Sequence, residues 1–313
     1  VNNSLVFEYM PYLDIIDYIS HMEQLQEKYS FVLIVSPRLR NYLDNMDYEI
    51  EKKRNLGIAI KSKDLLLKDD FNEFFNTVNC SLHRQLRLPQ MWDAYHICKM
   101  EKSANFSVPG SGKTSIVYGA FAYLLKKQKV DKIVMIGPKN SFLSWKDEFI
   151  ECFANNLKLS CLDIHSDEYA NNKLFSLKYY SKDKNLILIN YESVPNLYNE
   201  LKKIIDSKTM LVFDEVHRIK SVNGQRSSLC LKLSEKPCYK VVLTGTPIPN
   251  GYKDFYNLLN ILYVNEYKHY FGFSPNFLDN AVKDIEKIEK INDKIYPFFC
   301  RTTKENLCVP KPE

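Results

Sequence analysis

A short glycine-rich segment carries residue types that bind phosphate. Residues 104–115 read ANFSVPGSGKTS, and an amphipathic helical pattern follows directly. In such a loop, glycines let backbone N–H groups point at phosphate oxygens, and a lysine reaches the β- and γ-phosphates. A threonine hydroxyl can hold Mg²⁺, so we expect ATP and Mg²⁺ here. The residues predicted to contact them are Pro109, Gly110, Ser111, Gly112, Lys113, Thr114 and Ser115.

One position of this loop departs from the usual pattern. Ser107 stands where the first glycine of a phosphate-binding loop is normally found. A glycine-rich turn that precedes a helix by chance is the alternative interpretation. Other motifs along the chain must therefore support the interpretation of this segment as a phosphate-binding loop.

Two adjacent carboxylates supply that chemistry. Residues 210–220 read MLVFDEVHRIK, so four apolar residues end at Asp214 and Glu215. Both side chains should emerge at a strand end, where Asp214 can hold Mg²⁺ with Thr114 and Glu215 can deprotonate an attacking water. An acidic turn after a buried strand is the alternative. Downstream of a phosphate-binding loop, the pair favours ATP hydrolysis, with Lys113, Asp214 and Glu215 as catalytic residues.

A third segment completes an ordered set of motifs, because residues 243–250 read LTGTPIPN. The three motifs in this order resemble those of superfamily-two helicase-type ATPases. The form DEVHRIK resembles, more narrowly, the Swi/Snf-type DNA translocases. This resemblance implies a RecA-like P-loop NTPase lobe in which His217, Thr244 and Thr246 couple the ATP site to neighbouring segments.

Other segments carry the same resemblance. LRLPQ at residues 86–90 resembles the segment whose glutamine reads adenine, so Gln90 is expected to contact the base. A solvated surface glutamine is the alternative. Near the end of the resemblance, the family usually has two adjacent arginines where this chain has Arg301 and Thr302.

The resemblance also implies a surface for nucleic acid. In the family, loops at strand ends contact the phosphate backbone, which positions the protein without reading sequence. Trp145 has an alternative interpretation as a core residue, and Lys220 as a solvated helix residue. The candidate contacts are Pro138, Lys139, Ser141, Trp145, Asn190, Tyr191 and Lys220.

The elements that must position these motifs are short apolar runs separated by longer helical segments. The runs cover residues 132–136, 186–189, 210–213 and 241–243. Continuous apolar strands that alternate with helices predict a parallel sheet covered on both faces. Ligands of such sheets lie at the carboxyl ends of the strands, where the motifs fall. The predicted fold class is therefore α/β.

Two domains are expected. Residues 81–313 form the ATP-binding lobe, and residues 1–80 form a small α/β accessory domain with a strand at 31–35 and helices at about 12–29 and 37–54. No motif indicates what the accessory domain does. The family's second lobe, which supplies arginine fingers, is expected to lie outside this chain, so the chain alone should be nearly inactive.

Composition narrows the class of protein. The formal net charge is +5, yet residues 1–80 carry a net −4, so the rest carries +9. A basic excess suits a polyanionic partner but is weak evidence alone. Eight cysteines without CxxC pairs favour reduced thiols in a cytoplasm and no structural metal. No apolar run is long enough to cross a membrane, and the first residues do not resemble a secretory signal.

These observations favour an ATP-dependent translocase on double-stranded DNA. A strand-separating helicase on DNA or RNA is the first alternative. A non-hydrolysing, ATP-dependent interaction module is the second. By analogy with bacterial remodeller-like proteins, the setting is predicted to be restriction or phage defence, with protein partners in a defence complex.

Overall fold

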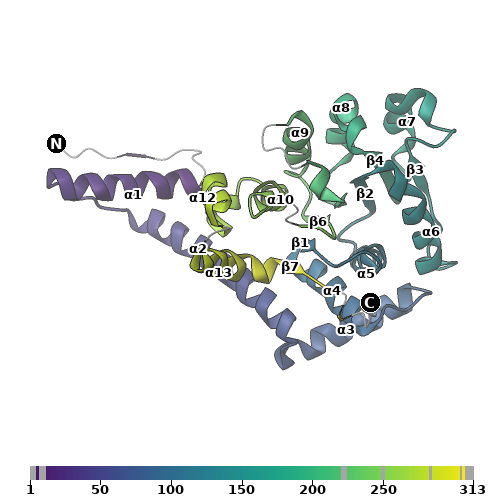
Figure 1. The fold of residues 1–313 in the computed structure, drawn as a ribbon, viewed down its shortest axis with the longest axis horizontal. Coiled ribbons are helices and arrows are strands. Elements are labelled where there is room, and N and C mark those ends of the chain that lie inside the picture. The colour runs from purple at the N-terminus through teal and green to yellow at the C-terminus, as the bar shows by residue number, and fades with distance from the viewer. Residues whose placement is uncertain are drawn as a thin grey trace.

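The computed structural model describes residues 5–6, 12–219, 224–247, 251–281, 284–303 and 305–306. In this part of the chain, seven parallel strands form one sheet in the order β3-β4-β2-β5-β6-β1-β7 (Figure 1). The strands are β1 (Lys102–Asn105), β2 (Lys132–Gly137), β3 (Cys161–Asp163), β4 (Leu186–Asn190), β5 (Thr209–Asp214), β6 (Tyr239–Leu243) and β7 (Phe299–Cys300).

Helices connect the strands and extend the fold at its amino-terminal side. The α-helices are α1 (Tyr12–Tyr29), α2 (Pro37–Ser62), α3 (Lys68–Ser81), α4 (Leu88–Met100), α5 (Lys113–Lys126), α6 (Phe142–Phe153), α7 (Lys173–Tyr180), α8 (Val194–Ile204), α9 (Gln225–Leu233), α10 (Asp254–Leu262), α11 (Tyr267–Tyr270), α12 (Pro275–Asn280) and α13 (Ile285–Ile295). The short 3₁₀ turns are η1 (Leu65–Leu67), η2 (Lys139–Ser141), η3 (Ala170–Asn172), η4 (Tyr191–Ser193), η5 (Val216–Ile219) and η7 (Tyr296–Phe298). None of the described helices is both long and apolar enough to pass through a bilayer.

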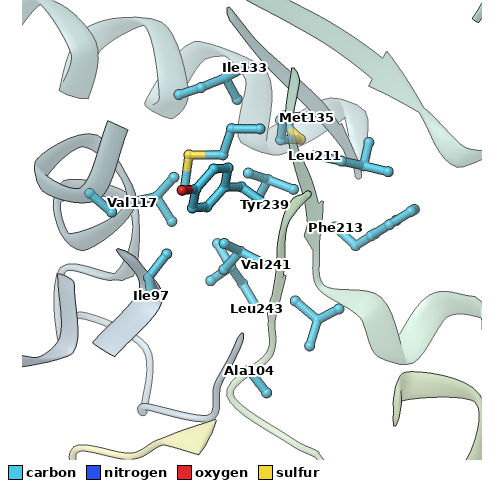
Figure 2. Close-up of a cluster of buried hydrophobic side chains, with 14 of the residues drawn as sticks. Ile97, Ala104, Val117, Ile133, Met135, Leu211, Phe213, Tyr239, Val241 and Leu243 are labelled. Carbon is cyan, nitrogen blue, oxygen red and sulfur yellow. The ribbon is translucent and has the colours of Figure 1, made fainter. Parts of the chain in front are cut away.

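The four apolar runs expected as strands are confirmed as β2, β4, β5 and β6. Every residue of β4, β5 and β6 is buried, as expected when helices cover both faces of a parallel sheet. Helices α4, α5 and α6 pack side by side, as do α8, α9 and α10, and Figure 1 shows these groups on opposite faces. Figure 2 shows part of the resulting core, where Ile97 of α4 and Val117 of α5 lie among side chains of the central strands.

The strand predicted at residues 31–35 is wrong. Residues 30–36 belong to neither a helix nor a strand, and Val32 and Ile34 are 81% and 84% exposed. Ser36 caps α2 with its side chain and Pro37 opens the helix, so the apolar run is a short link between two helices. No strand of the described residues pairs with this apolar run, so extended backbone gains no ladder hydrogen bonds there. The described part of residues 12–81 is accordingly helical, not α/β.

Helices α2 and α3 share the core of the sheet-bearing lobe. A Cβ on Gly57 of α2 would lie 2.3 Å from the carbonyl oxygen of Pro297, so the helix backbone approaches η7 closely. Phe74 of α3 is fully buried and meets Tyr95 of α4 edge-on. The domain boundary at residues 80 and 81 stays a prediction, although packing continues across it.

Candidate ATP site and nucleic-acid face

The phosphate loop connects β1 to α5 at the carboxyl edge of the sheet. Gly110 and Gly112 have φ values of +80° and +83°, a region that side chains disfavour. A Cβ on Gly112 would also lie 2.3 Å from Nε2 of Gln90, whereas a Cβ on Gly110 would meet open space. At position 112, both the positive φ and the close approach of Gln90 favour glycine over any other residue. At position 110 the positive φ favours glycine, and the open space leaves room for a ligand above the loop.

Ser107, the departure from the usual loop sequence, has a structural role. Its backbone N–H donates to Oδ1 of Asn105 over 3.0 Å, and its hydroxyl accepts from the N–H of Thr302 over 2.8 Å. The N–H of Val108 also donates to the carbonyl oxygen of Thr302 over 3.1 Å. The loop is therefore attached to the segment that follows β7, a contact that glycine could make only in part.

Lys113 points back into the loop. Its Nζ lies 3.0 Å from the carbonyl oxygen of Ser107 and 3.5 Å from that of Val108. Burial lowers the pKa of Lys113, while the carboxylates of Glu215 and Asp214 act in the opposite direction. A cation held by carbonyl groups beside two carboxylates can move to phosphate oxygens with little reorganisation.

Asp214 is fixed by the strands and helix around it. Nε1 of Trp145 donates to its Oδ2 over 3.1 Å, and the N–H of Glu215 donates to its Oδ1 over 3.0 Å. The hydroxyl of Tyr191 donates to the Asp214 carbonyl oxygen over 2.8 Å. Glu215 has a φ of +48°, unusual for a residue with a side chain, so the turn after β5 is over-determined by its neighbours.

The predicted coupling residues come together beside this turn. Nδ1 of His217 lies 3.0 Å from Oε2 of Glu215 and 3.1 Å from Oγ1 of Thr244. The backbone N–H of Thr246 donates to the same Oγ1 over 3.1 Å. A protonated Nδ1 would link the carboxylate to the segment after β6, which makes the group suited to transmit movement.

A pocket of about 620 Å³ brings together the phosphate loop and the two carboxylates that follow β5. Lys113 and Thr114, the first two residues of α5, line it together with Asp214 and Glu215 at the end of β5. The open space over Gly110, the left-handed glycines and the facing carboxylates fit a Mg²⁺–triphosphate group. Thr114 and Asp214 would hold the metal, which screens the phosphate charge, and Lys113 would contact the phosphates.

Gln90 also lines this pocket, but its side-chain amide already makes hydrogen bonds to other residues of the chain. Its Nε2 donates to the carbonyl oxygen of Ser111 over 2.9 Å, and its Oε1 accepts from the N–H of Arg87 over 3.0 Å. Adenine recognition by this amide stays a prediction, and it requires the base to compete for or bridge these contacts.

Sequence reasoning missed several polar residues of the pocket, among them Arg84, Ser144 and Glu148. Arg84 pairs with Glu148 and donates to Oγ of Ser115 over 3.1 Å, and Glu148 also accepts from that hydroxyl. Ser144 lines the pocket too. The only sequence signal was the position of Glu148 three residues after Trp145, because contacts across α6 and the segment before α4 depend on the tertiary fold.

The predicted nucleic-acid contacts divide into accessible and buried side chains. Lys139 is exposed at the end of β2, and Ser141 is partly exposed but lines the phosphate pocket. Pro138 and Asn190 are buried at strand ends. For Trp145 and Tyr191, each 1% exposed and bonded to Asp214, side-chain contact with DNA is corrected to a supporting role in the core. Lys220 lies outside the described residues.

The same edge holds a basic group that the sequence did not indicate. Nε2 of His165, after β3, lies 2.7 Å from Oδ1 of Asn190. Nζ of Lys173 lies 3.2 Å from Nδ1 of that histidine. Lys173 and Lys139 thus carry positive charge beside neighbouring strand ends.

Comparison with known proteins agrees with this geometry. The family model of the SNF2-related domain matches residues 11–312. The ISWI chromatin-remodelling complex ATPase ISW2 of Saccharomyces cerevisiae is 26% identical over 65% of this chain and 18% of its own length. An uncharacterized ATP-dependent helicase of Mycoplasma genitalium is 28% identical over 65% of this chain and 19% of its own length.

A solved structure shares the fold. The SWI2/SNF2 ATPase core of Sulfolobus solfataricus in complex with double-stranded DNA aligns with a TM-score of 0.59 at 23% identity. The alignment covers 73% of this chain and 47% of the Sulfolobus chain. This chain therefore spans under a fifth of those two curated relatives and about half of the solved core.

Proposed function

We propose, from the premise that this chain belongs to the SNF2-related domain family, that it is the first lobe of an ATP-driven translocase on double-stranded DNA. The observation that supports this best is the shared pocket of Lys113, Thr114, Asp214 and Glu215. A cation, a hydroxyl and two carboxylates in one pocket are the groups that ATP hydrolysis requires.

In this proposal each residue has one task. Lys113 leaves the carbonyls of Ser107 and Val108 to contact the β- and γ-phosphates. Thr114 and Asp214 hold Mg²⁺, and Glu215 orients and deprotonates the attacking water. His217 links Glu215 to Thr244, so a change at the γ-phosphate can reach the segment after β6.

Double-stranded DNA is the proposed track because two observations favour it. The aligned Sulfolobus core was solved with double-stranded DNA. In this chain, Lys139, His165 and Lys173 place basic groups along one edge of strand ends, which suits phosphate contacts without base readout. A second RecA-like lobe would face this edge and supply arginine fingers to the ATP site.

The test is ATPase activity of the two-lobed protein with duplex DNA, single-stranded DNA and RNA. We expect stimulation by duplex DNA of any sequence, with affinity falling steeply from about 50 to 200 mM salt. Lys139→Glu should weaken binding equally on different sequences, and Lys202→Glu on α8 is the matched control. Sequence-specific or salt-independent binding would contradict the proposal.

The alternatives predict different outcomes in the same assays. A strand-separating helicase would displace one strand of a duplex and prefer a single-stranded overhang. A non-hydrolysing interaction module would bind ATP without turnover, against which the paired carboxylates count. The role in restriction or phage defence stays a prediction from sequence analogy.

A further inference from the structure

A second pocket opens between α2, α4 and the segment around β7. Its volume is about 750 Å³, within the roughly 300–1,000 Å³ typical of small-molecule sites. It shares Arg87 and Gln90 with the phosphate pocket, and its other lining residues are distinct. Apart from Ser111 of the phosphate loop, the proposed ATPase chemistry uses none of those distinct residues, so the pocket needs a separate explanation.

Two buried polar atoms of this pocket lack a hydrogen-bond partner among the described residues, and a lysine lies against its aromatic wall. Oδ2 of Asp93 and Oγ of Ser111 are buried and make no hydrogen bond within the described part of the chain. Nζ of Lys61 lies 3.5 Å and 3.9 Å from the ring centroids of Tyr296 and Phe299. Leaving a buried polar atom unpaired costs about 1–3 kcal/mol, so the arrangement is expensive unless a ligand uses it.

Burial shifts the pKa values of both Asp93 and Lys61 toward the neutral forms. It raises the pKa of Asp93 to about 6, against opposing effects of the Cys300 thiol and the Lys61 ammonium. It lowers the pKa of Lys61 to about 8, against Cys300 and Asp93. The pocket thus presents an acceptor at Asp93, a donor at Lys61 and a hydroxyl at Ser111, all poorly hydrated.

The remaining walls narrow the class of ligand. Trp92, Tyr296 and Phe299 offer aromatic faces, and Lys63, Arg87 and Arg301 add positive charge to the lining. A planar heterocycle with both N–H donors and ring acceptors would satisfy Asp93 and Lys61 and would stack on the aromatic walls. An attached phosphate would use the cations. An amino acid would use Asp93 and Lys61 but leave the aromatic walls and the remaining cations without a role.

We propose that this pocket binds a second nucleotide, of the mononucleotide class, through Asp93 and Lys61. The ligand would also touch the ATP site. Ser111 belongs to the phosphate loop, and its carbonyl oxygen accepts from Nε2 of Gln90 over 2.9 Å and from Arg87 over 3.4 Å. Occupancy that repositions Ser111 therefore changes affinity for ATP, and ATP changes affinity for the second ligand by the same factor.

The experiment is calorimetric titration of the full chain with AMP and, separately, GMP. Both probes lack the β- and γ-phosphates that Lys113 would contact, so Lys113→Ala should leave their binding unchanged. Asp93→Asn and Lys61→Met should each weaken at least one probe by about tenfold or more, as expected for a hydrogen bond to a charged group. Lys202→Met, an exposed lysine of α8, is the matched control and should change nothing.

Three results would overturn the proposal. These are no binding of either probe, loss of binding in Lys113→Ala, or unchanged binding in both Asp93→Asn and Lys61→Met. Hydrogen exchange on the unmodified chain tests the same point without variants. AMP or GMP should slow exchange at residues 299–302 and at the start of α4, and protection confined to the start of α5 would count against the site. Neither readout needs DNA or turnover, so the outcome is independent of the proposed motor function.

Discussion

The sheet-bearing lobe and the amino-terminal arm, residues 12–56, use similar apolar residues with opposite results. In the lobe, every residue of β5 is buried, and its last residue is the carboxylate Asp214. In the described side chains of the arm, Ile15 alone is buried, and Figure 1 shows α1 and the start of α2 reaching away from the sheet. An apolar run becomes a strand only where a neighbouring strand edge is available to receive it.

The contrast extends to chemistry. At the strand ends, polar side chains are fixed by contacts from other elements, as Trp145 and Tyr191 fix Asp214. In the arm, the ion pair between Asp17 and Lys268 is exposed, and the part-buried contacts of Lys53 with Lys99 and Glu101 lie near the end that joins the lobe. Substitutions should therefore have large, specific effects in the lobe and small effects in the arm.

The largest expected effect tests how far the lobe suffices by itself. This chain alone should turn over ATP about 10³–10⁵-fold more slowly than a protein that also carries the second lobe, because arginine fingers are worth that much. Duplex DNA should not rescue it. A steady-state ATPase assay of both proteins decides the point, and near-equal rates would refute the two-lobe mechanism.

Next in size is the loss of the proposed general base. In the two-lobed protein, Glu215→Gln should slow hydrolysis by about 10²–10⁴-fold while ATP still binds, since an amide cannot take the proton from water. Glu23→Gln, an exposed residue of α1 in the arm, is the matched control. Single-turnover kinetics with a separate binding assay measures both quantities. Normal turnover in Glu215→Gln would remove Glu215 from this role.

A smaller effect concerns packing between α3 and the lobe. Phe74→Ala should lower the free energy of unfolding by about 3–5 kcal/mol, because Phe74 is fully buried against Tyr95 and Tyr123. Denaturant titration measures this. A loss below 1 kcal/mol would show that α3 is not part of the lobe's cooperative core.

A pH-dependent effect is expected at Lys240. This lysine is buried in β6, where its Nζ donates to the carbonyl oxygen of Ser234 over 3.0 Å, with Lys102, Glu266 and Cys238 as charged or titratable neighbours. Burial lowers its pKa in the folded state from 10.5 to about 7. The unfolded chain therefore binds more protons between those values, and this residue makes stability rise with pH across that window.

Lys240→Met removes that contribution. Its advantage over the unmodified chain should be greatest below pH 7 and shrink by on the order of 1–3 kcal/mol toward pH 10, given about 1.4 kcal/mol for a pKa difference of one. Lys28→Met, at an exposed lysine of α1 in the arm, is the matched control. Denaturant titrations at several pH values make the comparison, and parallel curves for the two variants would disprove it.

The smallest effect is expected in the arm. Because Val32 and Ile34 are already exposed, the double change Val32→Ser and Ile34→Ser should alter the free energy of unfolding by less than about 0.5 kcal/mol. Thermal unfolding followed by circular dichroism would measure it. A loss of 2 kcal/mol or more would mean that these side chains are buried in solution, and the contrast between the two regions would fail.

The amino-acid pattern was enough to predict the parallel sheet, four of its strands and the order of the motifs. Apolar runs such as residues 210–213 are local signals, and so are the glycines of the phosphate loop. Once the chain alternates strands and helices, the carboxyl ends of parallel strands meet at one edge. The grouping of Lys113, Asp214 and Glu215 in one pocket could therefore be predicted from the sequence.

The other features could not be predicted from local pattern, because the burial of a side chain and its choice of partner depend on residues far apart in the chain. From the sequence, Trp145 could be either a core residue or a surface contact. Its indole donates to Asp214, 69 positions away, which places it in the core. Residues 31–35 have the composition of a strand, but among the described residues no strand pairs with them. Ser107 departs from the usual loop sequence, and its role depends on a hydrogen bond that its hydroxyl accepts from Thr302, 195 positions away. Local pattern specifies what a segment can form, and long-range contacts determine which of those options gains free energy.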